Sequence, residues 1–105
     1  MWIVKGYDLQ MTVGDYGVKL PMTISGVTLG GSDAILFTLK SVHYTTVLTR
    51  TFMNIQDNTV NLILTSAESE DLQVGDYIYT LDWYQSGQFM CNLIDEAAFK
   101  VVAKA

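Results

Sequence analysis

Histidine, cysteine and clustered acids are the side chains that most often carry catalysis or bind metals, and this chain has few of them. His43 is its single histidine and Cys91 its single cysteine. A general base or a nucleophile needs a second group that activates it, and the sequence offers neither residue such a partner. We therefore expect His43 to be an ordinary loop or sheet residue. Cys91 alternates with apolar residues, so we expect a small, buried hydrophobic side chain.

The densest acidic stretch contains Glu68, Glu70 and Asp71, with Asp76 a little further along the chain. Carboxylate oxygens are good Ca²⁺ ligands, but this stretch lacks the alternating acidic spacing and the glycine of a calcium loop. We interpret it as a solvated acidic loop, and we predict no metal site and no cofactor. The Gly30-Gly31 pair lacks the strand-to-helix pattern of a phosphate-binding loop, so it is predicted to be a turn.

Composition limits the partners that the chain can have. It has 105 residues, 50% of them hydrophobic, and a formal net charge of −5 at pH 7. This length fits a single domain covering residues 1–105. Nucleic acids and anionic membranes attract basic surfaces, so neither is an expected partner. No apolar run approaches the roughly 20 residues of a membrane helix, and Met1–Lys5 lacks the layout of a secretory signal.

The segment Leu72–Tyr84 carries the clearest secondary-structure signal. After the turn signal Gly75-Asp76, its side chains alternate, which predicts a strand. The face predicted to lie in the core consists of Tyr77, Tyr79, Leu81 and Trp83. The lead-in Leu-x-x-Gly-Asp-Tyr also resembles a tyrosine corner, in which a tyrosine at the start of a strand bonds back to upstream backbone in Ig-like sandwiches. Tyr77 would be that tyrosine, and we expect Tyr77 and Trp83 to be structural residues.

The rest of the chain is a series of short alternating runs separated by turn residues. These runs cover residues 7–13, 18–24, 34–40, 45–53, 60–65, 89–94 and 99–103. The first two look like hairpin partners around a turn at Gly14–Gly17. Pro21 has no N–H to donate, which confines its strand to an edge or a bulge. The run Ala34–Lys40 is apolar on both sides, which indicates a central strand, and Leu48 and Phe52 favour the even-numbered side of 45–53 as the inward one.

Two connections can be predicted from their residue types. Residues 66–72 are expected to form at most a one-turn helix; Ser66 and Ser69 make no capping box, but Thr65 or Ser66 could cap the turn. Gln85–Gln88 is expected to be a tight hairpin turn. About eight short strands at this spacing predict an all-β fold, a sandwich or barrel, and argue against βαβ units.

Several runs together resemble small phage and prophage tail proteins, which are similar to the N-terminal domain of siphophage baseplate upper proteins. The similar runs are Gly14–Gly26, Ser32–Lys40, Leu72–Trp83, Phe89–Ile94 and Phe99–Val101. They share a Gly-Asp turn before a strand, an Asp-led strand ending Phe-Thr-Leu-Lys, and the pattern Leu-x-x-Gly-Asp-Tyr-x-Tyr-x-Leu-x-Trp. The resemblance implies an Ig-like antiparallel β-sandwich that is a structural part of a virion, made in the bacterial cytoplasm and without catalytic residues.

Three functions from different classes follow. The first is a non-enzymatic tail or baseplate subunit that contacts other virion subunits or itself, with a homo-oligomer as a candidate state and the threonine-rich run Thr45–Met53 as a candidate edge strand. The second is a carbohydrate- or receptor-binding module that uses surface aromatic residues on a cell-surface saccharide. An enzyme is the third and least supported. The candidate interaction residues are Trp2, Tyr16, Tyr44 and Tyr84.

Overall fold

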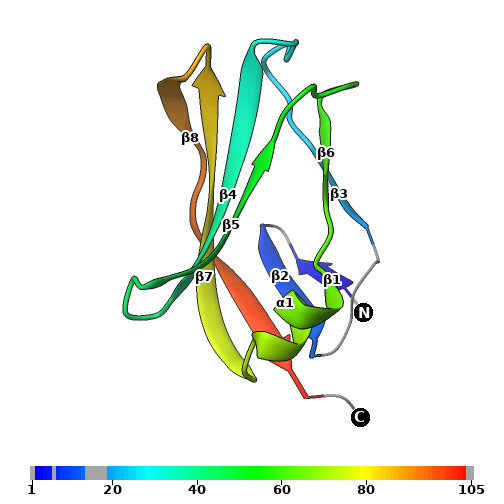
Figure 1. The fold of residues 1–105 in the computed structure, drawn as a ribbon, viewed down its shortest axis with the longest axis vertical. Helices are drawn as coiled ribbons and strands as arrows, with labels where there is room; N and C mark the ends of the chain where they lie inside the picture. Colours follow the sequence, from blue (N-terminus) through cyan, green and yellow to red (C-terminus); the bar gives the residue numbers. More distant parts are fainter. Residues whose placement is uncertain (1, 6, 14–18, 104–105) are drawn as a thin grey trace.

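The computed structural model describes residues 2–5, 7–13 and 19–103, the first of these ranges by its backbone alone. It shows two β-sheets in a sandwich-like arrangement, with a short helix (Figure 1). The elements are β1 (Trp2–Lys5), β2 (Asp8–Thr12), β3 (Leu20–Thr23), β4 (Asp33–Ser41), β5 (Thr46–Phe52), β6 (Thr59–Leu62), α1 (Ser66–Asp71), β7 (Gly75–Gln85) and β8 (Gln88–Val102). The predictions of an all-β sandwich and of a short helix near residues 66–72 are confirmed.

The larger sheet has six strands in the order β1-β2-β8-β7-β4-β5, and β3 pairs with β6 to form the smaller sheet. In Figure 1 the strands β8, β7, β4 and β5 lie to the left of β3 and β6. The neighbours β8-β7-β4-β5 follow the order of strands G, F, C and C′ in variable-type Ig domains, and β3 and β6 take the places of strands B and E. The prediction of a central position for the run Ala34–Lys40 is confirmed, because β4 lies between β7 and β5.

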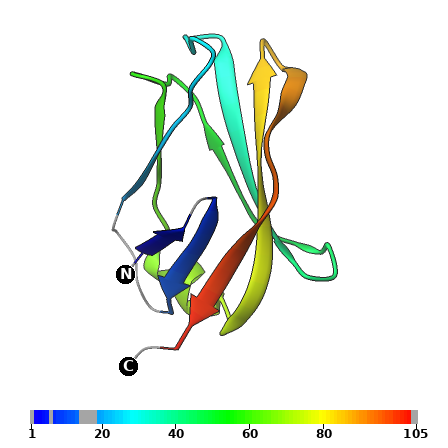
Figure 2. The ribbon, with the colours of Figure 1, turned by 180° about the vertical axis from the view of Figure 1, so that it is seen from behind.

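One pairing departs from the expected antiparallel sandwich. Strand β2 lies beside β8 and runs parallel to it, with Leu9 opposite Phe99 and Met11 opposite Val101 (Figure 2). Parallel neighbours need a long connection between them, and these two strands come from the two ends of the domain. Alternation along a strand shows which face is buried, but it does not give the direction of the neighbouring strand.

For the same reason the predicted hairpin between the first two runs is wrong. Strand β2 pairs with β1 and β8, while β3 pairs with β6. The predicted turn at Gly14–Gly17 lies outside the described residues. The last two predicted runs, 89–94 and 99–103, also form one long strand, β8. Its register against β7 shifts near Glu96, which has a φ of 58°, so a bulge replaces the predicted break.

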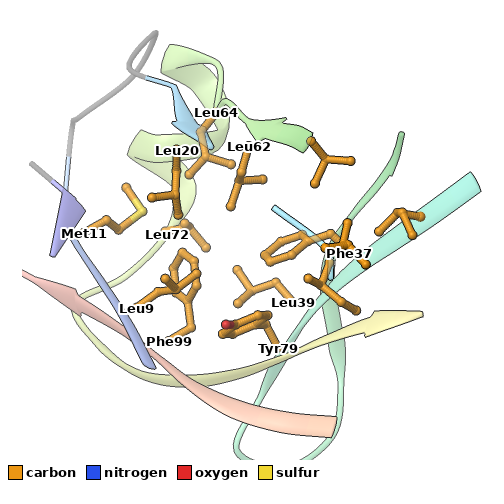
Figure 3. Packing of buried hydrophobic residues seen from close by; sticks show 14 of the residues in the cluster. Leu9, Met11, Leu20, Phe37, Leu39, Leu62, Leu64, Leu72, Tyr79 and Phe99 are labelled. Carbon is orange, nitrogen blue, oxygen red and sulfur yellow. The ribbon is translucent and has the colours of Figure 1, made fainter. Parts of the chain in front are cut away.

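The core lies between the two sheets and is built from alternating positions (Figure 3). In β4, Ile35, Phe37 and Leu39 are completely buried. The ring of Phe37 packs on Tyr79 of β7 and Phe99 of β8, with centroids 5.6 and 6.3 Å apart. Each such side chain removes a large apolar area from water, which is the main source of stability in a chain without a disulfide.

Tyr77 has the hydrogen bonds of a tyrosine corner. Its hydroxyl donates to the Gln73 carbonyl at 2.9 Å and accepts from the Gln73 N–H at 3.1 Å. Tyr77 lies near the start of β7, just after α1. This position corresponds to the E–F corner of an Ig domain. The two hydrogen bonds therefore hold residue 73, which precedes β7, against the start of that strand.

Candidate interaction surfaces

The side chains best suited to catalysis or metal binding do not lie close together. His43 is exposed in the turn between β4 and β5. Cys91 is also exposed, on β8 opposite Trp83, so the prediction of a buried Cys91 is wrong. The two-stranded sheet is narrower than the six-stranded sheet and leaves this part of β8 uncovered. Within residues 7–13 and 19–103, no three histidine, cysteine, aspartate or glutamate side chains gather as a metal site would require.

The aromatic residues predicted to contact a partner are dispersed as well. Tyr44 is 62% exposed in the β4–β5 turn, with a φ of 66°. Tyr84 is half-buried at the opposite end of the sheet, where its ring packs edge-to-face on Phe89 with centroids 5.6 Å apart. Trp2 is opposite Met11 in the β1–β2 pairing, but its side chain and all of Tyr16 lie outside the described residues. Tyr44 and Tyr84 therefore cannot act on the same small ligand.

Asn58 joins two of the connections at the loop end of the sandwich, the end with residues 24–32, 53–58 and 86–87 (top of Figure 1). Its side-chain oxygen accepts the Leu29 N–H at 3.0 Å, and its amide donates to the Ile24 and Val27 carbonyls at 3.1 and 2.6 Å. Asn58 itself has a φ of 52°, a left-handed conformation that asparagine tolerates better than most residues. One asparagine thus holds the β3–β4 connection against the β5–β6 turn.

Asp33 is the second residue whose side chain joins separate segments at the loop end by hydrogen bonds, and it is only 4% exposed. Its carboxylate accepts the Gly30 N–H at 2.7 Å and the Trp83 indole N–H at 2.9 Å. The Gly30 N–H, followed by the Trp83 indole, holds the pKa of the Asp33 carboxyl below its usual value, against the opposing effect of burial. These bonds connect the start of β4 to β7. Asp33 leads the strand motif of Ser32–Lys40, but its bond to Trp83 was not predicted, because the two residues are far apart in the sequence. Asn58 stands in no recognisable motif, so its role was not predicted either.

A different polar network lies at the other end, around α1. The Thr65 hydroxyl accepts the Glu68 N–H at 3.2 Å, and the Glu68 carboxylate accepts the Thr65 N–H at 2.9 Å, which completes a capping box. Arg50 of β5 donates to the same carboxylate at 2.5 Å. Burial raises the pKa of Glu68, but the Thr65 N–H and the Arg50 guanidinium outweigh it, so the pKa lies below its usual value. This capping box was not predicted, although the spacing Thr65-x-x-Glu68 is its sequence signature.

Strand β5 lies at one end of the six-stranded sheet, as the threonine-rich run was expected to do. Its burial alternates, with Leu48, Arg50 and Phe52 facing inward and Thr49 and Thr51 exposed. The even-numbered side is therefore the inward one. One side of β5 pairs with β4, and its other backbone groups have no strand beside them among the described residues.

Two hollows open where the smaller sheet leaves the core uncovered. One, of about 590 Å³, lies between the end of β5 and the start of β6, with Phe52, Gln56 and Asn61 among its lining residues. The other, of about 360 Å³, is an apolar groove beside β3 that reaches Tyr79 and Leu81. Burial raises the pKa of Tyr79 to about 12, with a smaller effect from Asp8, and its hydroxyl donates to the Tyr7 carbonyl. Neither hollow brings a base and a nucleophile together.

None of the helices in the described chain is long and apolar enough to cross a bilayer. Comparisons with protein-family models, with curated proteins and with solved structures found no match.

Proposed function

We propose that the chain is a non-enzymatic structural subunit of a phage or prophage virion, a tail or baseplate component that acts by binding neighbouring subunits. The sequence resemblance to baseplate proteins supports the virion setting. The free edge of β5 is the single observation that carries the assembly role. A strand with unpaired N–H and C=O groups can accept an extended segment of another chain as a new neighbour.

Natural proteins usually block such edges, and β5 differs from β3 in this respect. Pro21 lies in β3, which pairs with β6 on one side only. Ile24 donates its backbone N–H to Asn58, and hydrogen-bonded positions alternate along a strand, so the nitrogen of Pro21 faces the free side. A proline there discourages strand addition.

Strand β5 carries no such protection. Thr46–Phe52 contains no proline, glycine or lysine. Its one charged residue, Arg50, is already paired with Glu68. Exposed Thr49 and Thr51 suit a strand interior and offer no charge that would repel a neighbour. Strand β5 is thus better suited than β3 to accept an extended segment of another subunit.

Incorporation into particles tests this role. The double variant Thr49→Lys/Thr51→Lys places two ammonium groups along β5, and Ser25→Lys/Thr28→Lys makes the same charge change in the exposed β3–β4 connection. In phage particles purified from a host that expresses each form, the proposal predicts loss of the β5 variant and retention of the loop variant. Equal incorporation of both variants would show that β5 is not the assembly edge. Circular dichroism of each purified chain controls for folding.

A carbohydrate-binding module is the second candidate, and one observation favours it. Phe89 is 53% exposed and packs on Tyr84, so the pair offers an apolar ring surface to a solvent-facing ligand. Gln85 and Gln88 beside it supply amides that can hydrogen-bond hydroxyl groups. Titration with host cell-wall saccharides, followed by Trp83 fluorescence, tests this. A saturable change that is lost in Phe89→Ala would support it, and no response at millimolar saccharide would exclude it.

A further inference from the structure

The β7–β8 hairpin carries two side-chain pairs on the outward side of the six-stranded sheet, where no described element lies over it (Figures 1 and 2). The indole of Trp83 points inward to the start of β4, so its neighbours Asp82 and Tyr84 point outward. The ring of Tyr84 packs edge-to-face on Phe89, and the Asp82 carboxylate accepts a hydrogen bond from the Asn92 amide. An aromatic pair and a polar pair therefore lie next to each other on one face.

A bulge in β8 creates this arrangement. Phe89 and Asn92 are three positions apart, so in a regular strand their side chains would point to opposite faces. The register against β7 shifts between Trp83 and Tyr84, which adds one residue to β8 between the two pairs. Phe89 is thereby level with Tyr84, and Asn92 is level with Asp82. Bulges that redirect a side chain in this way are common beside functional sites.

The polar pair has hydrogen-bonding groups left for a ligand. Asp82 keeps its second carboxylate oxygen, and Asn92 keeps its side-chain oxygen and one N–H; none of these has a partner among the described residues. Two neighbouring hydroxyl groups of a sugar can bind such a pair together, because each hydroxyl both donates and accepts. Positions 82 and 84 are about 7 Å apart along the strand. A sugar ring stacked on Phe89, which is 53% exposed, is therefore within reach of the polar pair.

The charges around the two pairs are acidic. Asp95 and Glu96 are exposed in the next bulge of β8, one level beyond Asp82. Among the described residues of this face the nearest cation is Lys40, four residues of strand from the level of Asp82, or about 14 Å away. That distance exceeds the Debye length at physiological ionic strength. A carboxylate or phosphate on the ligand would therefore be repelled, whereas an uncharged sugar or a protonated amino sugar would not.

We propose that the pairs Tyr84–Phe89 and Asp82–Asn92 form a binding site for one pyranose ring that carries no anionic group. The aromatic rings contact the C–H face of the sugar, and the polar pair binds two neighbouring hydroxyl groups. The site rests on the second candidate function, to which it adds the polar pair and the ligand class. A pyranose of about 12 non-hydrogen atoms on an open surface should bind with a dissociation constant of roughly millimolar order.

Three monosaccharides of similar shape and different charge test the site: D-glucosamine, methyl β-D-glucopyranoside and D-glucuronate. Each is titrated into the isotopically labelled full chain at about pH 6, where the amine is protonated and the carboxylate is ionised. The titrations extend to about 50 mM, far above the expected constant. Amide NMR shifts in β7 and β8 report binding. Glucosamine should bind most tightly and glucuronate most weakly, with dissociation constants roughly three- to tenfold apart.

Two variants separate the parts of the site. Phe89→Ala should weaken the binding of all three sugars about threefold or more, because it removes the stacking ring. Asp82→Asn keeps the size of the side chain and removes its charge, so the difference in affinity between glucosamine and glucuronate should shrink. Tyr44→Ala removes an exposed ring at the other end of the sheet, and Asp71→Asn removes an exposed carboxylate at the end of α1. These two matched controls should bind the sugars as the unchanged chain does.

The absence of a shift with any of the three sugars at about 50 mM would overturn the site. So would shifts that persist unchanged in Phe89→Ala. Binding that depends on Phe89 but is equal for the three sugars, and unchanged in Asp82→Asn, would overturn the polar pair and the ligand class and leave a carbohydrate-binding module. A chain that binds none of the sugars but still enters phage particles would lose this site and keep the virion role. The amide spectrum of each variant without sugar controls for folding.

Discussion

Replacing Tyr77 with phenylalanine removes one oxygen and tests the corner that positions β7. The hydroxyl makes two hydrogen bonds to the Gln73 backbone, at 2.9 and 3.1 Å. Each such bond contributes about 0.5–1.5 kcal/mol net to stability. The Gln73 backbone is exposed, so water can satisfy its N–H and C=O in the variant, and the loss falls in the lower part of that range. We expect Tyr77→Phe to lower the free energy of unfolding by about 1–2 kcal/mol.

Urea unfolding followed by tryptophan fluorescence measures this change, since Trp83 is half-buried next to β4. The corresponding fall in melting temperature is roughly 5–15 °C for a domain of this size. Tyr44→Phe is the matched control, because Tyr44 is 62% exposed and its hydroxyl has no partner among the described residues; its effect should stay within about 0.5 kcal/mol. Equal effects of the two substitutions would refute the corner as a source of stability. All measurements use one low protein concentration, because association would add to the apparent stability.

Four further changes test other parts of the structure. Phe37→Ala should cost about 3–5 kcal/mol, because it opens a cavity among the rings of Tyr79 and Phe99; a loss under about 1 kcal/mol in urea unfolding would contradict the packing. Asp33→Asn should weaken the tie to the Trp83 indole and speed hydrogen exchange at the loop end, whereas unchanged exchange would show that the tie is unimportant. The pKa of Glu68 is lower in the folded chain than in the unfolded chain, where it is near 4.3. Its carboxylate therefore stabilises the fold above that pH, and this contribution is lost as the pH falls through the folded pKa. Glu68→Gln should make the free energy of unfolding less dependent on pH below about 4.5, and an unchanged pH dependence would contradict this. Tyr79 has a pKa of about 12, so stability should fall as the pH rises from about 10 towards that value, and Tyr79→Phe should remove this slope if the assignment is right.

Local patterns predicted which faces of the strands are buried. Alternation placed Tyr79 and Leu81 in the core, and it placed Leu48 and Phe52 on the inward side of β5, because side chains of successive strand residues point to opposite sides. Turn chemistry predicted the β7–β8 hairpin, whose Ser86 and Gly87 have positive φ. These features depend only on residues close together in the sequence.

Pairing between distant segments could not be predicted in this way. Nothing in the residues 8–12 shows that they lie parallel to the far end of β8, because alternation is the same whatever the neighbour. The loop end depends on Asn58 and Asp33, and both bind backbone or side-chain groups that come close only once the sheets have formed. Cys91 was misplaced because its alternation with Phe89 and Leu93 gives no sign that the smaller sheet stops short of it.

Quantitative mass spectrometry of phage particles, purified from a host that carries this coding sequence, tests the central proposal most directly. A structural subunit should be present in a fixed copy number relative to the major tail protein, and it should remain after washing in high salt. Absence of the chain from intact particles, or a trace amount that varies between preparations, would contradict a virion role.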